Sequence, residues 1–442
     1  MNGKINRHAG RDNEPGEVTS QRGLCALNGR SPEWRRIHRM STDSHAAPPT
    51  ETPAVAQARV LVDPYRDWSV AEGIPIHLDF GHNLLELETG LWDRYDAKGC
   101  FAHTHGAGDF MANYVLEVAP GAKTRPVRHL YEVFCYVLAG HGSTKVWLPG
   151  GEVRTFEWGP KAMFAVPLNC KYQIFNATAA HAVRISCTND APITINLYHN
   201  LDFVFNNSFE FPERAGASRH FEGEGEHSTW IAANTIKRNL WETNFVHDLS
   251  SFKLYEFEER GKGSTNVSFI LADGTMHAHV SQIPAGRYKK AHRHAAGTHV
   301  HAVDGVGYSL LWYEGESEFK EFPWRHGFMY TPPFWMFHQH FNTGPQPARY
   351  LACSLGSRRY PFISLRRKSS EGAGSISISQ GGRQIDYEEQ DPRIHHKWLQ
   401  AMQQAGVASQ MGEVFDEPAI LQLPVESLSG VIRSPKSIGP AV

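Results

Sequence analysis

The sequence lacks several features that would place it in a common class. It has six cysteines, widely spaced and without a Cys-x-x-Cys pair, so a disulfide framework is not indicated in a chain of 442 residues. No apolar run approaches the roughly 18 residues of a membrane-spanning helix. The 44 basic and 46 acidic residues nearly cancel, which gives no electrostatic reason to expect nucleic acid or a membrane as a partner. We therefore expect a cytoplasmic protein with reduced thiols.

Histidine, by contrast, is plentiful, with 25 residues in the chain. One short run contains His292 and His294, and a later one contains His338 and His340. Neutral imidazole is the commonest side-chain ligand for first-row transition metals. The sequence therefore predicts a metal centre assembled from these two runs.

The chain divides into β-rich parts and connecting parts. Short apolar runs broken by Gly, Pro and Asn recur over residues 110–200 and again over 270–356, which is typical of β-sandwiches and barrels. We predict five parts: a disordered extension over 1–55, a first β domain over 56–200, a connector over 201–250, a second β domain over 251–365 and a tail over 366–442.

The two ends of the chain carry further signals. The first 55 residues lack the apolar core of a signal peptide, and Met40 is an expected alternative start to Met1. A Ser/Gly-rich stretch over residues 369–382 indicates a mobile loop near the other end.

Helices are expected outside the β regions. Asp391 as a cap, Pro392 at the first position and Gly406 as a stop predict a helix over about 391–405 in the tail. A capping hydroxyl in the connector also permits a helix over 229–245. We expect the tail helix to pack on the β region or on a partner subunit.

The two β regions resemble the paired motifs of the cupin superfamily, in which a glycine-framed His-x-His run precedes a run with proline, histidine and asparagine. The second region matches at eight positions: Gly286, His292, His294, Gly305, Gly307, Pro333, His338 and Asn342. Over residues 100–360 the chain is similar to a bicupin. The resemblance implies an all-β bicupin, with two β-barrel (jelly-roll) cupin domains and a few peripheral helices.

The resemblance also implies a metal centre in the second cupin domain. Its ligands would be His292, His294 and His338, with open positions for water, substrate or dioxygen. The position of the usual glutamate ligand falls at Thr298, so no carboxylate is expected there. Such a neutral ligand set leaves the full charge of a divalent metal available to a bound anion.

The first copy keeps the glycine frame of the motifs but loses the ligands. His129 is the one ligand position that is kept, and Val127, Val133 and Tyr172 stand at the others. We therefore predict that the first cupin domain is structural. The alternative is a metal in that domain completed by Glu132 and nearby histidines.

Within the superfamily, the second copy is most similar to the ring-cleaving dioxygenases of gentisate, salicylate and 1-hydroxy-2-naphthoate. These also carry a His-Arg-His run and a Pro-x-Trp-x-x-His-x-His pattern, here from Pro333 to His340. The similarity implies Fe(II), with Mn(II), Zn(II) or Ni(II) as the alternatives that such ligands also hold. Val300 stands where that family has an arginine that grips the ring carboxylate, so we expect a phenolic or diketone-like ligand without a carboxylate.

Further histidines flank the expected metal ligands. His277 and His279 alternate on one strand and so share a face, which by the resemblance lines the pocket. We predict that these two and His340 orient substrate or move protons, with satisfied core histidines as the alternative. His299 and His301 alternate the other way and are expected at an interface or on the surface.

These observations lead to a functional hypothesis and two alternatives. The first is a non-haem Fe(II) dioxygenase, an oxidoreductase that uses dioxygen to cleave a carbon–carbon bond in a small aromatic or related oxygenated substrate. The second is a Mn-, Zn- or Ni-dependent cupin hydrolase, lyase or decarboxylase, in which the metal acts as a Lewis acid. The third is a storage or ligand-binding bicupin without activity. A homodimer or larger homo-oligomer is expected, because an exposed sheet edge is usually covered by a partner.

Overall fold

The computed structural model describes residues 62–422, apart from residues 109, 233–235, 296, 317–318, 358 and 361–372. The predicted extension over residues 1–55 and the alternative start at Met40 lie outside the described residues, as do residues 369–372 of the predicted loop over 369–382. The rest of that loop contains two short 3-10 helices, η6 (Ala373–Ser375) and η7 (Ile378–Gln380). The residues from Asp63 onward belong to one compact unit. No helix in the described part is long and apolar enough to cross a membrane.

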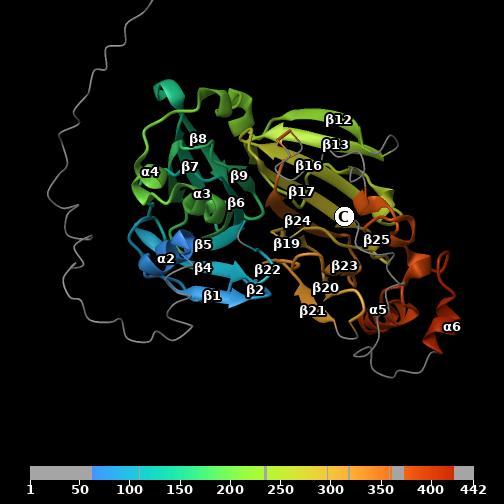
Figure 1. Cartoon of the computed structure of the whole chain (residues 1–442). Helices are drawn as coiled ribbons and strands as arrows, with labels where there is room; N and C mark the ends of the chain where they lie inside the picture. Colours follow the sequence, from blue (N-terminus) through green and yellow to red (C-terminus); the bar gives the residue numbers. More distant parts are fainter. Residues whose placement is uncertain are drawn as a thin grey trace, which may run out of the picture. The chain divides into compact units, whose positions relative to one another are not determined.

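The first half of the described chain forms a larger and a smaller sheet (Figure 1). The larger sheet has the order β1-β4-β5-β11-β6-β9-β14, with β3 paired to β4. Its strands are β1 (Ile76–Asp79), β3 (Gly90–Trp92), β4 (Ala97–Thr104), β5 (Ala112–Val118), β6 (Val133–Ala139), β9 (Met163–Ala165), β11 (Val183–Asn189) and β14 (Phe245–Val246). The smaller sheet has the order β10-β7-β8, from β7 (Gly142–Trp147), β8 (Val153–Trp158) and β10 (Lys171–Asn176).

The second half forms a matching pair of sheets. The larger has the order β12-β13-β16-β17-β24-β19-β22-β2, with β15 paired to β16, and the smaller has the order β21-β20-β23-β18-β25. The strands of the larger sheet are β2 (Gly81–Asn83), β12 (Glu226–Ala232), β13 (Ile236–Thr243), β15 (Tyr255–Glu256), β16 (Thr265–Leu271), β17 (Met276–Ile283), β19 (His299–Asp304), β22 (Phe328–Tyr330) and β24 (Ala348–Leu355). Those of the smaller are β18 (Ala291–His292), β20 (Gly307–Trp312), β21 (Lys320–Trp324), β23 (Phe337–Asn342) and β25 (Gln384–Ile385).

The two halves repeat one strand arrangement. The order β4-β5-β11-β6-β9 of the first repeat corresponds to β16-β17-β24-β19-β22 of the second, and β10-β7-β8 corresponds to β23-β20-β21. Hydrophobic residues at alternate positions of these strands fill the space between each pair of sheets. The fold is therefore an all-β bicupin with a few peripheral helices, which confirms the predicted fold class.

Each repeat also supplies a short strand to the other. β2 precedes the main strands of the first repeat in the sequence but pairs with β22 of the second repeat. Conversely, β14 precedes the main strands of the second repeat but pairs with β9 of the first repeat. The strands next to them in the sequence, β1 and β13, stay in their own repeats and run parallel to β4 and β16. Because backbone hydrogen bonds cross between the repeats at both places, neither repeat completes its sheet alone.

The helices lie outside the sheets. They are α2 (Pro64–Ala71), α3 (Ala191–Tyr198), α4 (Leu201–Asn206), α5 (Pro392–Ala405) and α6 (Glu417–Leu421). α5 begins where Asp391 accepts a hydrogen bond from the Arg393 N–H and ends before Gly406, which takes φ 65°. Its buried face includes Trp398, whose indole N–H donates to the Asn342 carbonyl at the end of β23 (2.8 Å). The tail helix therefore packs on the second repeat, on the strand that carries two of the predicted site histidines.

The helix predicted over residues 229–245 is wrong. This segment forms β12 and β13, an antiparallel pair that runs in register from Glu226 opposite Glu242 to Ala232 opposite Ile236. Several of its residues are β-branched or aromatic, and these favour a pleated strand over a helix once a neighbouring strand is present. β16 supplies that neighbour, and a local capping signal could not reveal it.

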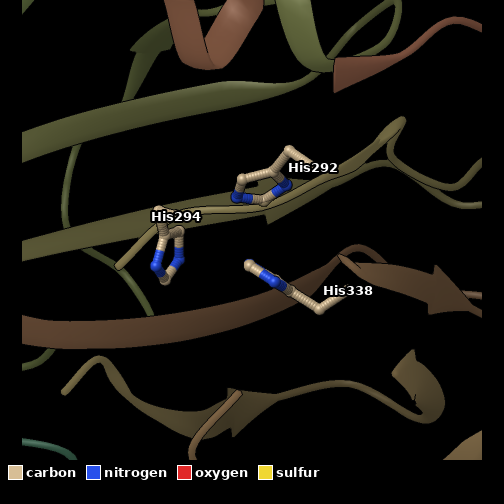
Figure 2. Close-up of side chains that lie close together, drawn as sticks. All are labelled: His292, His294 and His338. Carbon is tan, nitrogen blue, oxygen red and sulfur yellow. The ribbon is translucent and has the colours of Figure 1, made fainter. Parts of the chain in front are cut away.

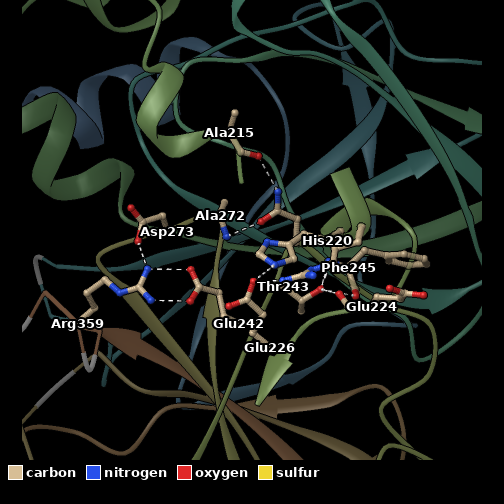
Figure 3. A network of polar contacts seen from close by, with 12 residues as sticks. Ala215, His220, Glu224, Glu226, Glu242, Thr243, Phe245, Ala272, Asp273 and Arg359 are labelled. Carbon is tan, nitrogen blue, oxygen red and sulfur yellow. Dashed lines mark hydrogen bonds and ion pairs between the residues drawn. The ribbon is translucent and has the colours of Figure 1, made fainter. Parts of the chain in front are cut away.

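A polar network ties the end of β13 to the β16–β17 turn of the same repeat (Figure 3). The Arg359 guanidinium donates to Glu242 (2.8 Å) and to Asp273 (2.6 Å). The side-chain oxygen of Asn244 accepts from the Ala272 N–H (3.0 Å). These contacts tie the segment between β13 and β14 to the β16–β17 turn, where the chain passes from one repeat to the other.

Candidate metal centre in the second repeat

Three histidines meet inside the second repeat. His292 lies on β18, His294 follows it, and His338 lies on β23, directly opposite His292 in the antiparallel pairing. One nitrogen from each of the three rings lies within 4.8 Å of the others. Figure 2 shows His292 and His294 approaching His338 from one chain segment. The structure thus brings together the three residues that the sequence predicts as metal ligands.

Close backbone approach makes this meeting possible. Gly307 on β20 stands opposite Asn342 on β23, and a Cβ at Gly307 would lie 1.9 Å from the Phe341 carbonyl oxygen. The glycine therefore lets β20 hold β23, and with it His338, against the interior. Trp335 takes φ 64°, and its N–H donates to the His294 carbonyl (3.1 Å). This contact joins the two ligand-bearing segments directly.

Hydrogen bonds set which ring nitrogens remain available. Nδ1 of His294 lies 2.8 Å from the Ala295 carbonyl oxygen, and Nδ1 of His338 lies 3.3 Å from that of Met336. Because a carbonyl only accepts, both Nδ1 atoms carry hydrogen, and each Nε2 keeps its lone pair for a ligand bond. Nδ1 of His292 has no hydrogen-bond partner among the described residues.

The electrostatic surroundings favour neutral imidazoles. Burial is the largest cause that holds the pKa of His292 and His338 well below the ordinary value, and the neighbouring imidazoles and Arg260 lower both further. The pKa of His294 is also lowered, mainly by burial. Metals bind the neutral ring, so these donors suit a divalent transition metal without losing a proton first.

His340 lies beside the three histidines. Its ring centroid is 5.6 Å from that of His338, and it stacks on Trp324 with the planes 12° apart. Its Nδ1 lies 2.9 Å from the Ser309 hydroxyl and 2.8 Å from that of Tyr330. The structure therefore places His340 in the interior with one nitrogen engaged by two hydroxyls.

The other two predicted site histidines lie farther along. His279 and His277 on β17 have ring centroids 5.4 Å apart. Tyr350 stands between His279 and His340, with its centroid 5.9 Å from the former and 4.6 Å from the latter. His279 thus contacts Tyr350, which in turn contacts His340. His277 contacts His279 and lies farther from the three clustered histidines along β17.

Of the two positions expected for His299 and His301, an interface or the surface, the surface is wrong. Both are buried, with exposed fractions of 0% and 2%. Nε2 of His301 lies 3.0 Å from the Ser186 hydroxyl of the first repeat. The predicted alternation is right, because Val300 between them packs in the interior of the second repeat. The opposite face is covered by the other repeat instead of solvent.

These buried histidines predict a loss of stability in mild acid. Burial lowers the pKa of His299 to about 4 and that of His301 to about 3, below their ordinary 6.5. Between pH 6.5 and 4 the unfolded chain binds protons that the folded chain does not, so stability falls as the pH falls, by about 3 kcal/mol for a shift of His299's size. We expect the urea midpoint of His299→Leu to fall less between pH 7 and pH 5 than that of the parent. Equal slopes would contradict this prediction.

The first repeat has no comparable cluster among the described residues. Tyr172, at a ligand position, has its hydroxyl 3.0 Å from that of Tyr95 and 3.1 Å from Nε2 of His129. Glu132 accepts hydrogen bonds from the N–H groups of Thr275 (2.9 Å) and Met276 (2.8 Å) in the second repeat. Glu132 is therefore engaged between the repeats, which leaves the alternative of a metal completed by it without support.

Two cations near the histidines were missed by the sequence analysis. Lys289 is fully buried, and its Nζ lies 3.3 Å from the Tyr350 hydroxyl. Arg260 ends the short 3-10 helix η5 (Glu258–Arg260), and its Nη1 donates to the side-chain oxygen of Gln384 (2.9 Å). Lys289 could have been noticed as a charge within a run otherwise expected to be buried. Arg260 lies outside both motifs, and nothing in the sequence near it points to the site.

Apolar and aromatic side chains line the rest of the interior. The cluster comprises Ile283, Val300, Ala302, Leu311, Trp324, Tyr330, Met336, Ala348, Tyr350 and Ala352. A cavity of about 760 Å³ opens beside this wall and is lined by Leu311 and Met336, with Phe80 and His105 from the first repeat. None of the three clustered imidazoles lines that cavity. This wall gives the interior beside the histidines an apolar and aromatic surface, which suits a small guest.

Comparisons with known proteins were made on sequence and on structure. No protein-family model matches the chain, and no curated protein matches it. Among solved structures, a deletion mutant of Bacillus subtilis oxalate decarboxylase is 13% identical, with a TM-score of 0.41, over 63% of this chain and 78% of that chain. Lactobacillus farciminis oxalate decarboxylase in a formate complex is 12% identical, with a TM-score of 0.42, over 68% of this chain and 92% of that chain. At these values the likeness says nothing about activity.

Proposed function

We propose that this protein is a metal-dependent enzyme that cleaves a carbon–carbon bond in a small oxygenated molecule, with a lyase or decarboxylase reaction as the leading candidate. The observation that carries the proposal is the convergence of His292, His294 and His338, of which His338 is buried and the other two are partly exposed. No carboxylate joins them among the described residues. These three residues would hold Mn(II) or Fe(II), which supplies a Lewis acid that polarises a substrate oxygen.

The chain's own residues can supply what a lyase needs besides the metal. Arg260 places positive charge near the histidines, where an anionic substrate or product can be held. Burial, with Arg260 beside it, holds the pKa of Lys289 well below its ordinary value, so a bound anion would favour the protonated form of this amine. The hydroxyls of Ser309 and Tyr330 engage Nδ1 of His340, and burial holds the pKa of this ring well below its ordinary value, so it is neutral. In the tautomer whose Nδ1–H donates to a hydroxyl, Nε2 keeps its lone pair and can take up a proton. The apolar wall keeps bulk water from competing for that proton.

A dioxygenase is the second candidate. The stacked rings of Trp324 and His340 and the nearby Tyr350 offer flat surfaces that suit an aromatic substrate. Dioxygen chemistry would additionally require a redox-active metal, and a set of three imidazoles does not select iron over manganese. The lyase candidate needs no such selection and for that reason is placed first.

Gas exchange separates the two reactions. The protein loaded with Mn(II) or Fe(II) would be given a panel of small hydroxy- and oxo-carboxylates in a sealed cell, with and without dioxygen. We expect carbon dioxide release at the same rate under both conditions. Dioxygen uptake in step with product would transfer the proposal to the dioxygenase. Metal-loaded protein that turns over no member of the panel would count against an enzyme of either class.

A further inference from the structure

A lysine, Lys289, is buried in the second repeat. Its side chain is fully buried on the segment that leads into β18, and its backbone N–H donates to the His340 carbonyl (3.0 Å). Within the part of the chain that the structure describes, no carboxylate lies at ion-pair distance from its ammonium. The nearest acceptor is the Tyr350 hydroxyl, 3.3 Å away. Burying an ammonium group is costly unless a negative group pairs with it.

The next residue shows the usual arrangement. Lys290 is partly exposed and forms an ion pair with Asp386 (2.8 Å). The side-chain amide of Gln384 also donates to Asp386 (2.9 Å). The carboxylate of Asp386 is therefore committed to Lys290 and Gln384, and Lys289 has no share in it.

A second cation faces the same interior. The carbonyl of Arg260 accepts from the Lys290 N–H (2.9 Å), and its guanidinium donates to Gln384, which pairs with His292 across β25 and β18. Like Lys289, this guanidinium has no carboxylate at ion-pair distance among the described residues. Glu259 and Asp386, which pair with Arg238 and Lys290, act on it from farther away. The positive charge of Arg260 contributes to the lowered pKa of His292, His294 and His338, which places it close to all three rings.

The charges near the histidines do not balance. The Arg260 guanidinium and the buried amine of Lys289 stand beside neutral imidazoles without a carboxylate in ion-pair contact with either group in the described structure, and a bound divalent metal would add positive charge. A planar carboxylate matches both donors, because a guanidinium presents paired N–H groups and an ammonium presents a point charge. The aromatic wall formed by Tyr350 and Trp324 would receive the rest of such a molecule.

We propose that Lys289 and Arg260 form a carboxylate-binding subsite beside the three histidines, so that the substrate is a small oxygenated carboxylate. The subsite specifies the substrate class of the proposed function, and its role in catalysis rests on that function. It replaces the expectation of a ligand without a carboxylate, which relied on Val300 alone. In this chain the positive charge comes from segments before β16 and β18 instead of from β19.

Lys289→Met tests the subsite, with Lys290→Met as the matched control. The probes are benzoate and, as its uncharged counterpart, benzyl alcohol, titrated calorimetrically into the metal-free protein. We expect benzoate to bind Lys289→Met at least tenfold more weakly than the parent, and Lys290→Met to bind it like the parent. Benzyl alcohol should not distinguish the three proteins. Arg260→Gln, with Arg293→Gln as its control, is expected to weaken benzoate binding by a similar factor.

Thermal melting supplies a readout that a structural role would not give. An ammonium buried without a counter-charge opposes folding, so Lys289→Met should melt at the same temperature as the parent or higher in the absence of ligand. A melting temperature well below that of the parent, together with unchanged benzoate affinity, would make Lys289 a structural residue and overturn the subsite. Tight binding of inorganic phosphate in place of benzoate would likewise overturn the carboxylate assignment.

The experiments can refute the proposed subsite and the proposed metal centre independently of each other. Metal content of Lys289→Met should equal that of the parent, because the three histidines remain. If the parent binds no metal, the proposed function fails while the benzoate comparison still decides the subsite. If the parent binds metal and Lys289→Met keeps full benzoate affinity, the subsite fails alone.

Discussion

Replacing His338 by alanine is expected to abolish metal binding. Only three donors meet in the described interior, so the loss of His338 leaves two imidazoles, His292 and His294, two residues apart on one segment. Removing a group that merely orients a metal ligand costs about 10- to 100-fold in affinity, and removal of a ligand itself should cost more than that. Mass spectrometry of protein loaded with Mn(II) or Fe(II) is expected to find about one metal per chain in the parent and a small fraction of that in His338→Ala.

The loss of metal binding in His338→Ala should also change how metal affects the melting temperature. A metal that binds only the folded protein stabilises it by about 2.7 kcal/mol at a free concentration 100 times its dissociation constant. The parent should therefore melt at a higher temperature when metal is added, and His338→Ala should not. His181→Ala, which removes an exposed imidazole in the first repeat, is the control and should behave like the parent. Equal metal content in parent and His338→Ala would refute the assignment of this residue as a ligand.

The fold was predictable because its signal is local and repeated. Short strands and turns recur in both halves, and glycines such as Gly307 mark close backbone approaches that no other residue allows. The exchange of β2 and β14 between the repeats was not predictable. Each is only two or three residues long, and its pairing partner lies far away in the sequence. The bounds predicted for the domains remain a prediction for this reason, since the exchange crosses them.

The candidate site likewise has residues that the sequence could reveal and residues that it could not. His292, His294 and His338 meet because motif spacing within two adjacent strands fixes their positions, and spacing is visible in a sequence. Lys289 acquires its meaning from burial, and both Lys289 and Arg260 from the lack of an ion-pair partner in the described structure, which only the packed structure displays. The same holds for His299 and His301, whose strand face was inferred correctly but whose covering by the first repeat was not.

The two repeats share one strand arrangement, but their interiors hold different side chains. In the first, Tyr172 and its hydrogen-bonded neighbour Tyr95 occupy the interior, and His129 is held by the Tyr131 carbonyl (2.7 Å) and by Tyr172. Burial lowers the pKa of His129 to about 3, so it stays neutral and satisfied within the core. In the second repeat the corresponding space holds imidazoles and cations. The interior of the first repeat is thus consistent with the structural role that the sequence predicts for it.

His340→Ala is expected to retain the metal and to lose most of the turnover. The ring lies next to His338, but its Nδ1 is engaged by Ser309 and Tyr330, so it is placed to move a proton at Nε2 and is not one of the three clustered donors. A positioned acid or base contributes roughly 10²- to 10⁴-fold to a rate, and we expect kcat to fall within that range on the compound that the gas-exchange screen identifies. KM should change little, because the proposed anion contacts remain.

The pH dependence distinguishes proton transfer by His340 from a packing role. If the ring moves a proton at Nε2, kcat of His340→Ala should lose one limb of the parent's pH profile, and added imidazole should restore part of the rate by occupying the space left by the side chain. If the ring only packs on Trp324, the variant should melt at a lower temperature but keep the parent's kcat per bound metal and both limbs of its profile. Loss of metal from His340→Ala would instead assign it as a ligand, contrary to the geometry of the three-histidine cluster.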